Sequence, residues 1–138
     1  MHQGTNIFER DKSGVVIRPD DPDYPQLFAV IRKAMRTTAE LNALVTDDPQ
    51  LIREVFSKLV NYTVDDSFFL IPPFYSDFGE NIQIGKNVFV NHACTFMDRG
   101  GITLEDDVLI GDLYDRTDLI PFDKLQAFFQ QYLDVAAN

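Results

Sequence analysis

Side chains that could act as a catalytic base, a nucleophile or a metal ligand are scarce in this chain of 138 residues. It has two histidines, His2 and His92, and one cysteine, Cys94. A structural zinc site takes about four such ligands, so we expect no bound metal. A lone cysteine cannot form an internal disulfide, which argues against a disulfide-rich secreted protein and for a reducing, cytoplasmic location.

The charge balance restricts the possible partners. The chain carries 22 acidic and 12 basic side chains, for a net charge of −10. Because a phosphate backbone would be repelled, nucleic acid is not expected as a partner. No apolar run approaches the ~20 residues of a membrane span, and the polar N-terminus has no stretch typical of a signal peptide. We therefore expect one soluble domain with no membrane partner.

The first 22 residues have little periodicity. Residues 14–18 are apolar enough for a short strand. Residues 18–22 contain two prolines and two aspartates, which is typical of a turn. We predict an N-terminal arm over residues 1–22, either packed on the body or partly disordered.

A helical subdomain is predicted over residues 23–62. Its first helix begins near Asp23, carries apolar residues at helical spacing and ends near Asn42. The second helix begins with Asp48 as N-cap and Pro49 at the first helical position. Both helices are amphipathic, so they need a partner surface to be stable.

A period of six residues marks the segment 63–111. Large apolar side chains stand six apart, at Phe78, Ile84, Val90, Phe96 and, after an insertion of two, Leu104 and Ile110. Neither a helix nor a flat sheet has this period, whereas a parallel β-helix does, with three units to a coil. An antiparallel sheet with accidental spacing is the alternative. In the β-helix, Cys94 takes an inward position and is expected to be a buried structural thiol.

The repeat contains runs that resemble the maltose and galactoside O-acetyltransferase family. They are residues 71–82 (IPPFYSDFGENI), 85–92 (GKNVFVNH) and 95–103 (TFMDRGGIT), and the whole resemblance covers roughly residues 23–111. It implies a mainly β fold, namely a short left-handed parallel β-helix of about two coils preceded by two helices. It further implies a homotrimer with sites between subunits and transfer of acetyl from acetyl-CoA to a sugar hydroxyl.

The resemblance places two acceptor-binding residues in the repeat. The position that precedes the family's aromatic-glycine pair falls on Asp77, and the asparagine of the following coil falls on Asn91. Carboxylate and amide groups pair well with the O–H groups of a sugar. Alternatively, Asp77 forms a turn before Gly79, and Asn91 is a corner residue of the β-helix.

Further acidic positions of the family align less completely. Its acidic pair falls on Asp98 and Arg99, so that the second acid is replaced by a base. Asp98 is a weaker acceptor-binding candidate, and a turn role is favoured for it. The family's N-terminal acidic residue falls on Asp21 or Asp23.

The family's catalytic histidine has no counterpart in this sequence. In the family, a histidine from a loop with an Asn-His-Pro-like run takes the proton from the attacking hydroxyl. His92 is a candidate substitute base, although a surface or interface role is favoured. The basic residues Arg32, Lys33 and Arg36 could bind the phosphates of CoA, although a solvated helix face is favoured. The coils that would form the CoA groove are also missing.

Residues 112–138 do not resemble the family. Their spacing predicts an amphipathic helix capped by Asp123, and the segment could arise from a deletion, a frameshift, a fusion or a designed cap. The sequence therefore predicts a truncated, catalytically impaired sugar O-acetyltransferase that retains the acceptor side of the site. The alternative is a non-catalytic sugar-binding or assembly module.

Overall fold

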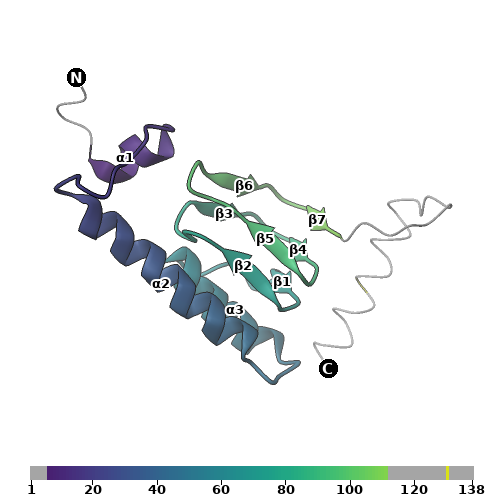
Figure 1. Cartoon of the computed structure of the whole chain (residues 1–138). Helices are drawn as coiled ribbons and strands as arrows, with labels where there is room; N and C mark the ends of the chain where they lie inside the picture. Colours follow the sequence, from purple (N-terminus) through teal and green to yellow (C-terminus); the bar gives the residue numbers. More distant parts are fainter. Residues whose placement is uncertain (1–5, 112–129, 131–138) are drawn as a thin grey trace, which may run out of the picture.

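The computed structural model describes residues 6–111 and Gln130. Figure 1 shows three helices beside a stack of short strands. In chain order the elements are α1 (Ile7–Lys12), α2 (Tyr24–Asn42), α3 (Pro49–Val60), β1 (Phe69–Leu70), β2 (Phe74–Ser76), β3 (Ile82–Ile84), β4 (Phe89–Val90), β5 (Cys94–Phe96), β6 (Ile102–Leu104) and β7 (Leu109–Ile110).

Helices α2 and α3 confirm the two helices predicted from the sequence. Helix α2 has Asp23 as N-cap and ends at Asn42. The side chain of Asp48 accepts a hydrogen bond from the Gln50 N–H at the start of α3. Helix α3 ends at Val60, and the φ of its C-cap residue, Asn61, is 65°, in the left-handed region that terminates many helices. The two helices pack against each other and against strands β1 and β2.

The arm differs from its prediction in two respects. Residues 14–18 form no strand, and a helix that we did not predict, α1, precedes them. The N-cap Asn6 accepts a hydrogen bond at 2.9 Å from the N–H of Glu9. Ile7 is 1% exposed and packs with Leu27 and Phe78, so the arm is attached to the body from α1 onward.

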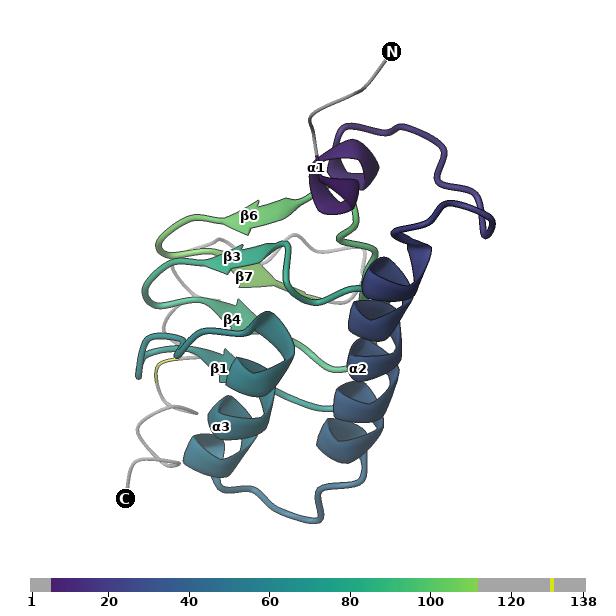
Figure 2. The same cartoon turned by 90° about the vertical axis from the view of Figure 1, so that its left-hand side faces the viewer.

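The strands form a parallel coil with three sides. Each side is a separate small sheet, with the strand orders β1-β4-β7, β2-β5 and β3-β6. All pairings are parallel, and consecutive strands lie on successive sides. Figure 2 shows β1, β4 and β7 stacked as rungs, with α2 alongside the coil. Six strands complete two coils and β7 begins a third, as the period of six predicts.

Three units of six would give a coil of eighteen residues, and the observed coils are longer. Phe69 pairs with Phe89, which pairs with Leu109, so each coil takes 20 residues. The insertion of two that the spacing indicates before Leu104 is confirmed in the corner 97–101, after β5, and the corner 77–81, after β2, has the same length, which the spacing did not predict. Phe78 therefore lies in a corner, and not in the inward row predicted for it. It packs against the arm, with its ring centroid 6.4 Å from that of Phe8.

One apolar core joins the helices to the coil. Phe56 of α3 is fully buried, with ring centroids 4.6 Å from Phe68 and 5.4 Å from Phe74. Phe74 in turn lies 5.0 Å from Phe96 of the next coil. Within the residues that the structure describes, no helix is long and apolar enough to cross a membrane. The expected C-terminal helix lies outside the described residues, apart from Gln130.

Candidate functional site

The buried carboxylate of Asp98 organises the corner between β2 and β3. Asp98 is 0% exposed. Its Oδ1 accepts hydrogen bonds from the Ser76 hydroxyl at 2.8 Å and the Gly79 N–H at 2.9 Å, and its Oδ2 accepts one from the Asn81 N–H at 3.1 Å. These donors come from one coil and Asp98 from the next. The carboxylate therefore fixes the corner 77–81 on the corner 97–101.

Asp77 lies at the surface of this corner. Its Oδ1 accepts a hydrogen bond at 3.0 Å from the Asp98 N–H, and the residue is half-buried. Burial raises the pKa of Asp77 above its ordinary value of 3.8, whereas the Asp98 N–H and the charge of Arg99 act in the opposite direction. Asp77 is thus a fixed, partly exposed carboxylate of the kind that binds hydroxyl groups.

Arg99 connects this corner to the arm. Its Nε donates to Asp11 Oδ2 at 3.0 Å, and its Nη2 donates to Asp11 Oδ1. The Asp11 side chain is 7% exposed, and the Arg99 side chain is 42% exposed. A bidentate pair of this kind is a strong and directional contact. It brings together residues that are 88 positions apart in the sequence.

The two N-terminal acidic candidates lie around one cation. Arg10 of α1 donates to Asp21 at 2.7 Å and lies 3.7 Å from a carboxylate oxygen of Asp23. The hydrogen bond from Arg10 lowers the pKa of Asp21. Asp23 is the more exposed of the two, at 51% of its side chain against 16% for Asp21. Of the two, Asp23 therefore keeps more of its carboxylate open to a ligand.

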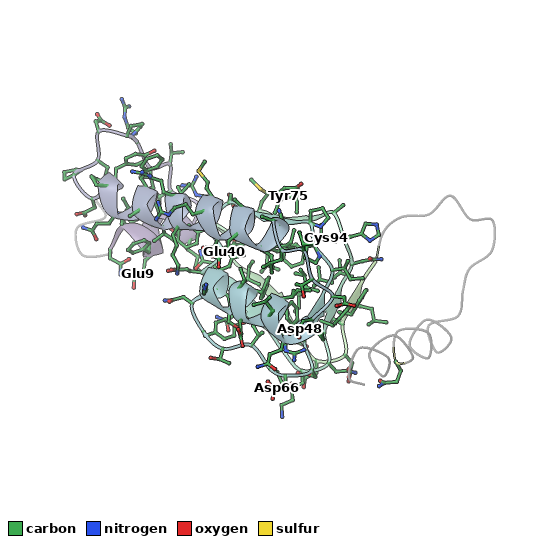
Figure 3. All side chains as sticks on the ribbon, turned by 90° about the horizontal axis from the view of Figure 1, so that it is seen from below. Glu9, Glu40, Asp48, Asp66, Tyr75 and Cys94 are labelled. Carbon is green, nitrogen blue, oxygen red and sulfur yellow. The ribbon has the colours of Figure 1, made fainter. Side chains whose placement is uncertain are left out.

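Asn91 and His92 lie at a different corner from Asp77. They follow β4 and precede β5, which begins at Cys94. The Asn91 Oδ1 accepts from the His92 N–H at 2.8 Å and lies 2.7 Å from His92 Nδ1. Figure 3 places Cys94 on the opposite side of the molecule from Glu9, which belongs to α1. Within a single copy of the chain, the corner that holds Asn91 therefore lies away from the corner that contacts α1.

The cysteine and the basic group of α2 were further candidates from the sequence. Cys94 is half-buried against the edge of the core, and so is less enclosed than we expected. On α2, Lys33 forms an ion pair with Glu80 at 2.9 Å. Within residues 6–111 and Gln130, no group of three or more His, Cys, Asp or Glu side chains could hold a metal ion.

Sequence reasoning missed Asp11, which contacts the candidate site from the arm. The signal that could have located its helix was the spacing of Asn6 and Glu9, which is that of a helix N-terminus. No local pattern predicts the pairing of Asp11 with Arg99, because it depends on how the arm folds back over the coil.

The fold is similar to that of two solved acetyltransferases. The structure matches the hexapeptide-repeat acetyltransferase VCA0836 of Vibrio cholerae, solved with acetyl coenzyme A, at a TM-score of 0.58 and 22% identity, covering 77% of this chain and 55% of that one. It matches galactoside acetyltransferase, solved with coenzyme A, at a TM-score of 0.58 and 21% identity, covering 77% and 51%. The chain therefore has the fold of the hexapeptide-repeat acetyltransferases.

Sequence relatives agree with this class. No protein-family model matches the chain. It is 32% identical over 91 residues to the candidate acetyltransferase YJL218W of Saccharomyces cerevisiae, over 65% of this chain and 46% of the relative. It is 27% identical over 118 residues to the sophorolipid acetyltransferase of Starmerella bombicola, over 78% of this chain and 44% of the relative. The chain is thus homologous to acetyltransferases and spans slightly less than half the length of these curated relatives.

Proposed function

We propose that this chain is the acceptor-binding part of a sugar O-acetyltransferase similar to those of the maltose and galactoside family. Its whole protein would move acetyl from acetyl-CoA to a sugar hydroxyl, on coils that wind in the left-handed sense. The observation that carries the proposal is the fixed corner at Asp77. Its half-buried carboxylate is held by the Asp98 N–H in the segment that resembles the family's acceptor site.

In the proposed mechanism, Asp77 accepts hydrogen bonds from sugar hydroxyls and orients the ring. Asp98 acts through Asp77, because its own carboxylate is buried and already accepts three hydrogen bonds. Because Asn91 lies at another corner, we propose that a homotrimer brings Asn91 of a second copy to the sugar held by Asp77. For such a site, the corner that holds Asp77 in one copy must face the corner that holds Asn91 in the neighbouring copy.

We further propose that these 138 residues alone transfer acetyl poorly. The sequence contains His2 and His92 as its histidines and has no Asn-His-Pro-like run to supply the family's base. Acetyl-CoA as co-substrate would need cations for its phosphates. On α2, the ammonium of Lys33 is already paired with Glu80, whereas Arg32 and Arg36 are exposed.

The first experiment tests sugar binding at Asp77. Maltose and a methyl galactoside are titrated against the ¹⁵N-labelled chain, its Asp77→Asn variant and the control Asp47→Asn, which changes an exposed loop residue. We expect Asp77→Asn to weaken binding about tenfold, through loss of a charged hydrogen-bond acceptor. The control should bind as wild type. Equal affinity in all three chains would contradict the role of Asp77.

The pH dependence of binding follows from the raised pKa of Asp77. Because the ionised carboxylate binds the sugar, affinity should fall as the pH falls through that raised pKa, and Asp77→Asn should abolish this dependence. Ionisation of Asp77 has the opposite effect on folding stability: it favours sugar binding but disfavours the folded state. Burial of the ionised form costs stability above about pH 3.8, so Asp77→Asn should be at least as stable as wild type at neutral pH.

A second experiment distinguishes an enzyme from a binding module. Release of free CoA from acetyl-CoA is measured with and without each sugar. We expect binding without turnover above background. Sugar-dependent release that disappears in His92→Ala would show that His92 serves as the base and that the chain is a complete catalyst.

A further inference from the structure

Arg99 occupies a position at which the resemblance predicts an acid, and the structure gives this base a specific partner. Its guanidinium donates from Nε and Nη2 to the two carboxylate oxygens of Asp11. Asp11 is nearly buried within the short helix α1. Arginine can make this two-point contact because its guanidinium is planar and presents parallel N–H groups.

The backbone of the same residue belongs to the corner that holds Asp77. The Arg99 carbonyl accepts a hydrogen bond at 3.0 Å from Asn81 Nδ2, and the preceding residue donates its N–H to Asp77. The Gly101 N–H then closes the turn on the Asp98 carbonyl at 2.8 Å. Any movement of Arg99 would therefore be transmitted to the carboxylate of Asp77 through one peptide unit.

The charges around Asp77 come from three elements. The charge of Asp98 raises the pKa of Asp77, and that of Arg99 lowers it. Asp11 of α1 contacts the guanidinium of Arg99 and is the main cause of the raised pKa of Arg99, to which Tyr24, at the start of α2, adds a smaller electrostatic contribution. Lys12 of α1 contacts the same turn, where its Cε is 3.2 Å from the position of a Cβ on Gly101. Of these groups, Arg99 is the one whose positive charge acts on Asp77.

We propose that Arg99 is a positioning residue of the acceptor site: its pair with Asp11 holds α1 on the corner 97–101, and its guanidinium keeps a cation beside Asp77. This assignment rests on the proposed function for its effect on sugar binding. The contact itself is independent of that function. It makes the arm one wall of the site and accounts for a base at the position of the family's second acid.

Three variants separate the two roles of Arg99. Arg99→Gln removes both the charge and the bidentate pair, Arg99→Lys keeps the charge but not the two-point contact, and Asp11→Asn removes the charge of the partner. Arg18→Gln is the matched control, because Arg18 lies in the same arm but its side chain is 79% exposed. Three quantities are measured: the ¹³C carboxyl titration of Asp77, amide hydrogen exchange in α1, and sugar affinity.

We expect Arg99→Gln to raise the pKa of Asp77, to speed amide exchange in α1 severalfold and to weaken sugar binding about tenfold. In Arg99→Lys the Asp77 titration should stay near that of wild type while α1 exchanges faster. Asp11→Asn should also speed exchange in α1. Arg18→Gln should change none of the three quantities.

An unchanged Asp77 titration and unchanged α1 exchange in folded Arg99→Gln would overturn the proposal. If Arg99→Gln does not fold, equal α1 exchange in Arg99→Lys, Asp11→Asn and wild type would overturn it. If wild type binds neither sugar, the proposed function fails instead. The titration and the exchange rates then still decide whether Arg99 holds the corner.

Discussion

At the scale of the residue, Gly79 shows how closely the candidate site is packed on the helices. Its φ of +84° is a conformation that side chains with a Cβ rarely adopt. A Cβ at this position would lie 2.6 Å from Leu59 Cδ1 and 2.7 Å from the Leu59 carbonyl oxygen. Its N–H also donates to Asp98. The corner that holds Asp77 can therefore sit on α3 only if this residue is glycine.

Gly79→Ala should therefore be strongly destabilising, and Gly14→Ala separates the causes. Gly14 has a similar φ of +87°, but a Cβ there would meet no atom within 4 Å. We expect Gly14→Ala to cost about 1 kcal/mol for backbone strain alone. Gly79→Ala should cost roughly 1–3 kcal/mol more, because the added methyl group overlaps α3. Urea denaturation measures both, and equal costs would show that the corner can move away from α3.

At the scale of the element, α3 depends on its N-terminal cap. The Asp48 side chain accepts a hydrogen bond at 2.9 Å from the Gln50 N–H, which no residue within the helix can satisfy. Asp48→Ala should lower the free energy of unfolding by about 1 kcal/mol. Its neighbour Asp47 is exposed, so Asp47→Ala is the control and should be nearly neutral. Thermal unfolding of the two variants tests the cap, and an equal loss in both would argue against it.

The elements that could be predicted from the sequence are those with local signals. Asp48 and Pro49 mark the start of α3, and the regular spacing of Ile84, Val90 and Phe96 indicates a coil. The insertion of two before Leu104 was visible in this spacing, but the equal extension of the corner 77–81 was not, because it leaves the six-residue spacing of the apolar side chains unbroken. Phe78 keeps the six-residue spacing and is buried, but it contacts the arm and not the coil interior.

The candidate site also has parts with local sequence signals and parts without them. Its residue types were predictable where a motif carries them, as at Asp77 and Asn91. The burial of Asp98 and the Arg99–Asp11 pair were not predictable, because both depend on contacts between segments distant in sequence. Helix α1 is an intermediate case. Its N-cap signal is local, but six residues are too few to form a stable helix without the body beneath them.

At the scale of the whole molecule, the helices and the coil are parts of one cooperative unit. Phe56 from α3 packs against Phe68, which precedes β1, and against Phe74, the first residue of β2. A second link is polar: the Asn42 side chain, at the end of α2, both accepts from the Phe74 N–H at 2.8 Å and donates to its carbonyl at 2.9 Å. Neither half retains a complete core if the other unfolds.

Phe56→Ala should therefore destabilise both halves together. Removing this fully buried ring should cost about 3–5 kcal/mol, against roughly 1 kcal/mol for Phe28→Ala on the exposed side of α2. Amide hydrogen exchange in α3 and in β4 should accelerate by the same factor in Phe56→Ala. If α3 exchanged much faster while β4 kept its protection, the coil would fold without the helices, and the corner that holds Asp77 would not depend on them for its stability.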